Sequence, residues 1–122
     1  MPLKAFDHVN VRTANLEAMV QWYDTILDMK AGARPDFPFG GAWLYLGDLA
    51  LVHLVAQEEQ PKSVDPQIEH FAISATGFED FMAHLERQGV EARVSKIESF
   101  GITQVNIFDP DGNHIHIDFM DG

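Results

Sequence analysis

Hydrophobic and polar residues alternate in several short stretches, and the same succession of stretches occurs twice. In residues 3–12, Val9 and Val11 point one way while His8 and Asn10 point the other, which predicts a strand with one apolar face. By similar patterns, further strands are predicted near 29–33, 43–46 and 49–56, and, in the second half, over 68–75, 90–97, 103–108 and 114–119.

Each half also contains one stretch with helical spacing. The first begins after Asn15, a typical N-cap residue, and its apolar stripe is formed by Leu16, Met19, Val20, Tyr23, Ile26 and Leu27. In the second, Thr76 and Glu79 have the spacing of a capping box and Gly89 ends the helix. Its stripe consists of Phe78, Phe81, Met82 and Leu85. Each half therefore predicts the order β-α-β-β-β.

The duplication is most visible at the histidines. Asp7-His8 and Glu69-His70 each open a half, and His53 and His116 lie in the strand that closes it, about 60 positions apart in both cases. A polar segment with two prolines, residues 57–66, separates the halves. We expect one α+β domain made of module 1–56, linker 57–66 and module 67–122, in which two curved mixed sheets enclose a cavity on their histidine-bearing faces.

Composition narrows the classes of partner and of site. The chain of 122 residues has 8 Lys and Arg against 19 Asp and Glu, a net charge of −11, which argues against nucleic acid and anionic membranes as partners. It has no cysteine, so a metal would have to be bound by histidine, carboxylate or amide oxygen. The lack of cysteine, of a signal-peptide pattern and of an apolar run of bilayer length leads us to expect a cytoplasmic protein.

The duplicated order and the histidine near the start of each copy resemble the vicinal oxygen chelate superfamily, which includes glyoxalase I, extradiol dioxygenases, and fosfomycin and bleomycin resistance proteins. Residues 108–116, FDPDGNHIH, look like the closing hairpin of that family. The resemblance covers essentially the whole chain and implies four metal ligands, one from the first and one from the last strand of each copy: His8, His53, His70 and His116. Relatives usually carry Glu at the position of His116, and glyoxalase I also does so at that of His53, so the usual carboxylate base is missing here.

Four imidazoles favour a divalent transition metal, namely Zn, Ni, Fe, Co or Cu, over calcium or magnesium. The resemblance implies a metal-dependent enzyme, a lyase, isomerase or dioxygenase, that chelates oxygens of a small oxygen-rich metabolite and stabilises an enolate or oxyanion. One alternative is a non-catalytic small-molecule binding protein like the bleomycin resistance proteins. Another is a closed four-histidine site with a structural or regulatory role. The simplest alternative is that the histidines only occupy polar strand faces.

Successive side chains of a strand point to opposite faces, and this alternation, or strand parity, gives further candidate site residues. Five residues on the histidine faces are expected to contact substrate: Asn10, Arg12, Trp43, Gln104 and Asn106. Tyr45 and Asp118 are expected to transfer protons in place of the missing carboxylates.

Other residues near the site receive weaker expectations. Parity places Glu69 on the face opposite His70, which would make it a poor base, and His114 shares the parity of His116 but lies at a turn. Phe37 and Phe39 lie in a stretch expected to form an irregular loop, where they would either form a lid over the site or pack against the protein. The resemblance further implies a homodimer, in which His8 and His53 of one chain meet His70 and His116 of the other.

Overall fold

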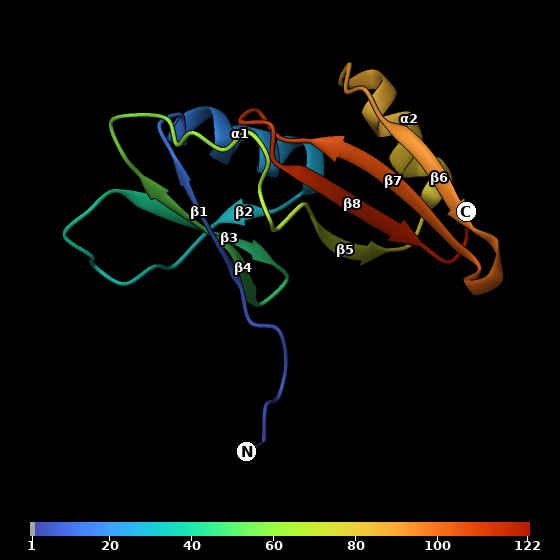
Figure 1. Cartoon of the computed structure of the whole chain (residues 1–122), viewed down its shortest axis with the longest axis horizontal. Helices are drawn as coiled ribbons and strands as arrows, with labels where there is room; N and C mark the ends of the chain where they lie inside the picture. The colour runs from blue at the N-terminus through green and yellow to red at the C-terminus, as the bar shows by residue number, and fades with distance from the viewer. Residues whose placement is uncertain (1) are drawn as a thin grey trace. The chain divides into compact units, whose positions relative to one another are not determined.

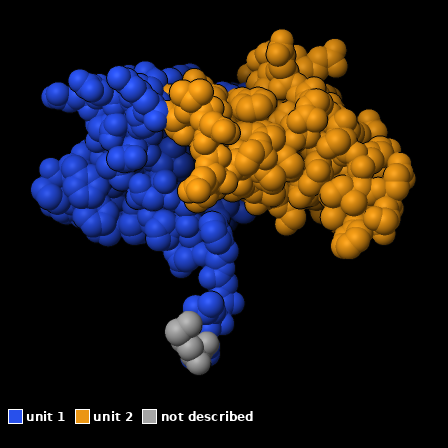
Figure 2. Space-filling model, viewed as in Figure 1, with its two compact units in different colours: residues 1–62 blue, residues 63–122 orange. Residues whose placement is uncertain are grey.

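A computed structural model describes residues 2–122 and divides the chain into two compact units, residues 1–62 (unit 1) and residues 63–122 (unit 2) (Figure 2). The division falls inside the segment 57–66 that the sequence analysis expects to be a linker. Among the helices of the described residues, none is both long enough and apolar enough to cross a bilayer.

Unit 1 is a four-stranded mixed sheet with one helix (Figure 1). Its elements are β1 (Val9–Thr13), α1 (Leu16–Leu27), β2 (Lys30–Ala31), β3 (Gly41–Leu46) and β4 (Leu49–Ala56). The strand order is β1-β4-β3-β2, with β1 parallel to β4 and the other neighbours antiparallel. The first and last strands of the unit are therefore neighbours.

Unit 2 repeats this arrangement. Its elements are β5 (Phe71–Ala75), α2 (Phe78–Arg87), β6 (Arg93–Ile97), a short 3-10 helix (Glu98–Phe100), β7 (Ile102–Phe108) and β8 (His114–Phe119). The order is β5-β8-β7-β6, and again the first and last strands, β5 and β8, are the parallel pair. The predicted α+β fold of two tandem β-α-β-β-β modules is confirmed.

The core of each unit lies between its helix and one face of its sheet. In unit 1 the fully buried Met19 and Tyr23 of α1 share the core with Val52 and Leu54 of β4. Because side chains alternate along a strand, His53 between those two residues points to the other face. In unit 2 the buried Phe119 of β8 contacts Phe78 and Phe81 of α2, with ring centroids 5.6 and 5.5 Å apart.

Three local predictions need correction. The first strands begin later than expected, at Val9 and Phe71, so the residues immediately before them do not follow strand parity. The capping box does not form, because Gly77, with φ 82°, is the N-cap of α2 and its N–H donates to Asp121 Oδ2 at 2.8 Å. The register shifts between Leu44 and Tyr45, so alternation is interrupted within β3.

The turn between β7 and β8 is built around the carboxylate of Asp109, which is 4% exposed. Its Oδ1 accepts the backbone N–H groups of Asp111 and Asn113, each at 3.0 Å. The backbone carbonyl of Asp109 also accepts the N–H of Gly112, whose φ of 84° suits glycine. The hairpin expected over residues 108–116 is observed, and its turn sets the start of β8, where His114 lies.

Candidate metal centre

The histidines of unit 1 lie on the sheet face opposite α1. Register places His53 of β4 between Asn10 of β1 and Trp43 of β3. The His53 ring stacks on His8 on one side and on Trp43 on the other, with centroid distances of 3.8 and 4.0 Å and interplanar angles of 11° in both cases. His8 and His53, predicted from the first and last strands, are thus brought together within this unit.

Hydrogen bonds determine which nitrogens of these two rings carry hydrogen. His8 Nδ1 lies 2.6 Å from the carboxylate oxygen Oδ1 of Asp7, so it donates. His53 Nε2 lies 3.0 Å from the backbone oxygen of Ala50, and a carbonyl oxygen only accepts. In the neutral rings, the lone pairs left for a ligand are therefore those of His8 Nε2 and His53 Nδ1.

The equivalent pair in unit 2 has the same stacked arrangement. His70 and His116 have ring centroids 3.8 Å apart and an interplanar angle of 10°. His70 Nδ1 donates to Glu69 Oε1 at 2.7 Å, which leaves Nε2 as its free nitrogen. His116 is 9% exposed, and its buried Nδ1 has no hydrogen-bond partner among the described residues.

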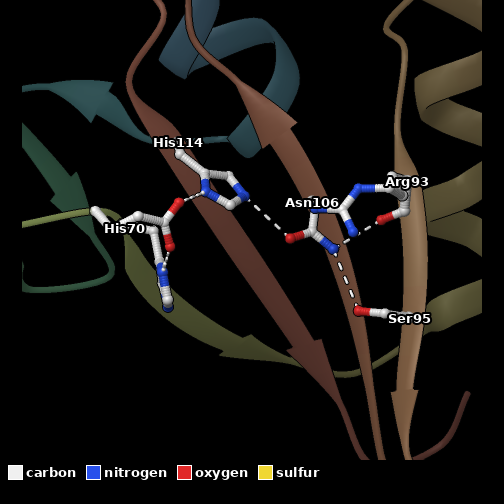
Figure 3. Close-up of polar contacts among 6 residues, drawn as sticks. His70, Arg93, Ser95, Asn106 and His114 are labelled. Carbon is white, nitrogen blue, oxygen red and sulfur yellow. Dashed lines mark hydrogen bonds and ion pairs between the residues drawn. The ribbon is translucent and has the colours of Figure 1, made fainter. Parts of the chain in front are cut away.

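A third histidine, His114, belongs to the unit 2 cluster. One nitrogen from each of His70, His114 and His116 can be chosen so that all three lie within 4.8 Å of one another. The two ring nitrogens of His114 already have partners, however: Nδ1 lies 2.5 Å from Glu69 Oε2, and Nε2 lies 3.0 Å from Asn106 Oδ1 (Figure 3).

The electrostatics favour neutral rings at the two buried histidines. Burial lowers the pKa of His53, and repulsion from His8 adds to the effect. Burial also lowers the pKa of His116, with further contributions from His70 and His114. Neutral imidazole is the form that binds a metal ion, so both residues suit a ligand role.

Glu69 is the residue that the parity argument misplaced. Since β5 begins only at Phe71, Glu69 is free of strand alternation, and its carboxylate accepts hydrogen bonds from both His70 and His114. These bonds, that from His70 first, lower the pKa of Glu69 to about 2. The signal that could have found it was the acidic residue directly before the first histidine of both copies, since Asp7 makes the same contact with His8.

The predicted substrate-binding residues differ in their surroundings. Asn10 and Arg12 are exposed on β1, and Trp43 stacks on His53. Gln104 is half-buried and pairs in register with Asp118 on the histidine face. Asn106 is 4% exposed, and both ends of its amide bond protein groups. The role of each in substrate binding stays a prediction.

The two predicted proton-transfer residues also lie in different environments. Asp118 Oδ1 is buried and has no hydrogen-bond partner among the described residues. The hydroxyl of Tyr45 donates to the carbonyl of Ala33 at 2.6 Å, and the register shift pairs Tyr45 with Ala50 rather than continuing the row of Trp43 and His53. Asp118 therefore keeps an acceptor available, whereas the Tyr45 hydroxyl is engaged.

An aromatic surface leads away from the histidines of unit 1. The rings of Phe37 and Phe39 stack with centroids 5.0 Å apart, and Phe37 lies 6.3 Å from Trp43. The guanidinium of Arg34 lies 5.0 and 5.4 Å from the two Phe centroids and donates to the Phe39 carbonyl. Sequence reasoning noted the two Phe residues but missed Arg34.

The residues present suit a divalent transition metal. Each unit supplies a stacked pair of imidazoles, one of which is buried with its neutral form favoured, and the orphaned Nδ1 of His116 is a buried nitrogen in need of a partner. His8, His53, His70 and His116 are the residues that would hold the ion. The union of the two pairs around a single ion remains a prediction.

These features define an α+β protein of two tandem β-α-β-β-β units with paired histidines on their polar sheet faces. The model of the Glyoxalase/Bleomycin resistance protein/Dioxygenase superfamily matches residues 5–117, and the chain belongs to that superfamily. No curated protein matches the sequence.

Solved structures share the fold at low sequence identity. A glyoxalase family protein from Bacillus anthracis is 20% identical, with a TM-score of 0.81 over 98% of this chain and 97% of its own. An integron cassette protein from the mobile metagenome of the Halifax Harbour sewage outfall is 24% identical, with a TM-score of 0.77 over 96% and 99%. The trypanothione-dependent glyoxalase I of Leishmania major is 19% identical, with a TM-score of 0.72 over 94% and 86%.

Proposed function

We propose that this protein is a metal-dependent enzyme that acts on a small metabolite with adjacent oxygen atoms, and that His8, His53, His70 and His116 hold a divalent transition metal. The observation that carries the proposal is the repeated histidine pair. Both units stack a histidine that precedes the first strand on one from the last strand, with the same 3.8 Å centroid distance. The same stacked pair in both copies supports a common role for these four rings.

The polar residues around the pairs supply the rest of the proposed site. The bound metal would act as a Lewis acid toward the substrate oxygens. Asp7 and Glu69 hold the Nδ1–H groups of His8 and His70, which leaves Nε2 of each ring free. Asp118, with its unpartnered buried Oδ1, would accept a substrate proton, and Arg12, Gln104 and Trp43 would bind and orient the substrate.

The assembly of the site follows from the same proposal. We expect a homodimer in which each site is shared between chains, and a cytoplasmic location. Sedimentation equilibrium would give the oligomeric state. Mixing a His8→Ala/His53→Ala double variant with a His70→Ala/His116→Ala double variant would test sharing, since a mixed dimer recovers one intact site only if the ligands come from both chains.

Metal content and thermal stability test the proposal directly. The purified protein is analysed for bound metal, and its thermal midpoint is measured before and after treatment with a chelator. At a free metal concentration of 100 times Kd, binding to the folded state adds about 2.7 kcal/mol. For a chain of this size that is a rise of roughly 8–12 °C in the midpoint. The metal-loaded protein is then assayed for isomerase, lyase and dioxygenase activity on metabolites with adjacent oxygens.

Loss of a residue that only orients a metal ligand weakens metal affinity up to about 100-fold. His53→Ala and His116→Ala remove ligands themselves and should weaken binding by more than that. His84→Ala on α2 is the matched control and should leave binding unchanged. The proposal would be contradicted if the purified protein contained no metal and its thermal midpoint changed neither with chelator nor with added zinc.

A second function, non-catalytic binding of a small aromatic molecule, is favoured by the surface formed by Arg34, Phe37, Phe39 and Trp43 in unit 1. Phe37 and Phe39 are 38% and 45% exposed and adjoin each other, and contiguous exposed apolar surface can mark a ligand-binding site. Quenching of Trp43 fluorescence by 8-anilinonaphthalene-1-sulfonate, in a Trp22→Phe background, would measure such binding. Unchanged quenching after chelation, together with absence of metal, would favour this function over the enzyme.

A further inference from the structure

A chain of hydrogen bonds connects the edge strand of unit 2 to the candidate ligand His70. Asn106 Nδ2 on β7 donates to the backbone carbonyl of Arg93 on β6 at 2.9 Å. Asn106 Oδ1 faces His114 Nε2 at 3.0 Å, and His114 Nδ1 faces Glu69 Oε2 (Figure 3). The second oxygen of Glu69 accepts from His70 Nδ1 at 2.7 Å. The chain therefore ends on the ring whose Nε2 is free.

The orientation of the Asn106 amide fixes one hydrogen on His114. A backbone carbonyl only accepts, so the amide atom that faces Arg93 must be the nitrogen. The atom that faces His114 is then the amide oxygen, which also only accepts. His114 Nε2 must therefore carry a hydrogen, and a nitrogen with a hydrogen has no lone pair for a metal.

The other nitrogen of His114 is occupied as well. A carboxylate oxygen next to Nδ1 is favourable only with a hydrogen between the two atoms, since two lone pairs would repel each other. Both nitrogens of His114 thus face acceptor oxygens of the protein in this arrangement, and neither is left open to a metal. By contrast, His116 has an unpartnered Nδ1 and His70 a free Nε2.

Packing keeps His114 in this position. Its side chain is only 10% exposed, and its ring stacks on Phe108 with centroids 4.8 Å apart and an interplanar angle of 15°. Asn106 is 4% exposed. A ring held between a stacked phenyl group and two hydrogen bonds is poorly placed to turn toward a metal.

We propose that His114 is not a metal ligand but a positioning residue, which together with Asn106 holds Glu69 so that Glu69 fixes the tautomer and orientation of His70. This inference rests on the proposed metal-binding function. It reduces the three clustered histidines of unit 2 to two ligands, His70 and His116, and leaves more of the coordination sphere for substrate oxygens. Partners that orient a ligating histidine in this way usually contribute to metal affinity.

The first test is nitrogen-15 NMR of the histidine rings in the metal-free protein. His70 should carry its hydrogen on Nδ1 in the unmodified protein, and Glu69→Ala should shift it toward a mixture of the two tautomers. Glu91→Ala, the removal of an exposed carboxylate elsewhere in unit 2, should leave His70 unchanged. A His70 ring with its hydrogen on Nε2 in the unmodified protein would overturn the inference.

The second test is zinc affinity, measured by competition with a chelating dye, with circular dichroism to check that each variant is folded. His114→Ala should weaken zinc binding about 10–100-fold. His114→Asn places an amide nitrogen near the position of Nδ1, can still donate to Glu69, and should bind within about threefold of the unmodified protein. Asn106→Leu, which frees His114 from its amide partner, should also weaken binding.

If His114 were a ligand, Ala and Asn would weaken binding equally, and Asn106→Leu would leave it unchanged or strengthen it. X-ray absorption of the zinc-loaded protein gives an independent count of imidazoles, which should be the same in the unmodified protein and in His114→Asn. A loss of one imidazole would overturn the positioning role while leaving metal binding intact. A protein that binds no zinc would overturn the proposed function instead, and the NMR experiment, extended to His114→Ala, would still decide whether Glu69 and His114 orient His70.

Discussion

The turn around Asp109 allows a prediction whose size can be worked from individual hydrogen bonds. Asp109 Oδ1 accepts two backbone N–H groups, from Asp111 and Asn113, and both carboxylate oxygens lie near Asn113 Nδ2, at 3.2 and 2.9 Å. Two substitutions separate these contacts. Asp109→Ala removes all of them, whereas Asp109→Asn keeps one oxygen for the two backbone groups and places an amide nitrogen against that of Asn113.

Hydrogen bonds to a charged group contribute about 1.5–3 kcal/mol each, and a buried donor left without a partner costs a similar amount. The bonds share one acceptor, so their energies do not simply add. We expect Asp109→Ala to lower the free energy of unfolding by about 3–4 kcal/mol and Asp109→Asn by about 1 kcal/mol. For a chain of this size the first corresponds to a fall of roughly 10–15 °C in thermal midpoint.

Urea unfolding followed by circular dichroism measures both differences, and calorimetry gives the midpoints. Asp48→Ala is the matched control, because Asp48 is an exposed aspartate in the β3–β4 turn. Its effect should stay within about 0.5 kcal/mol. If Asp109→Ala and Asp48→Ala destabilised equally, or if Asp109→Asn were as damaging as Asp109→Ala, the carboxylate would not organise the turn as described.

Four further substitutions test other parts of the fold. At Gly41 a Cβ would lie 2.2 Å from the backbone oxygen of Leu54, so Gly41→Ala must displace the sheet. It should lower the free energy of unfolding by more than about 3 kcal/mol in urea unfolding. At Gly112 an added Cβ meets no atom within 4 Å, so Gly112→Ala should cost only about 1 kcal/mol, because of the positive φ. Tyr45→Phe removes the 2.6 Å bond to Ala33 and should lower stability by about 1 kcal/mol; a tenfold loss of turnover with unchanged metal content would assign its hydroxyl to the chemistry. Phe119→Ala should destabilise unit 2 by about 3–5 kcal/mol by chemical denaturation, since this ring is fully buried, and a smaller loss would mean that the core of α2 and β8 is loosely packed.

Much of the fold could be predicted from the sequence because the hydrophobic pattern is set by packing. The stripe that includes Met19 and Tyr23 has helical spacing because α1 covers one face of a sheet, and Val52 and Leu54 alternate with His53 because β4 has one covered face. The duplication made the pattern more certain, since two independent segments gave the same order of elements. Local chemistry at the element ends was less predictable, as Gly77 replacing Thr76 at the N-cap of α2 illustrates.

The candidate site was only partly accessible to sequence reasoning. The internal repeat identified His53 and His116, which lie within strands. Strand parity failed for Glu69, which lies before the strand begins and is free to turn its carboxylate toward His70. The role of His114 depends on which atom of the Asn106 amide faces it, and that is determined by a carbonyl on a third strand. The alternation of side chains along a strand carries no information about such long-range hydrogen bonds.

The parallel pairing of the first and last strands has a consequence for how each unit folds. The β3–β4 and β7–β8 hairpins join neighbouring segments, whereas β1 reaches its partner β4 only after about 40 residues of intervening chain have been ordered, and β5 reaches β8 in the same way. We therefore expect the hairpins to form first and the first strands to dock late. Each histidine pair joins the first and last strands of its unit, so we expect the site to be completed at the end of folding and to open first on unfolding. The amide hydrogens of β1 and β5 should then exchange faster than those of β4 and β8.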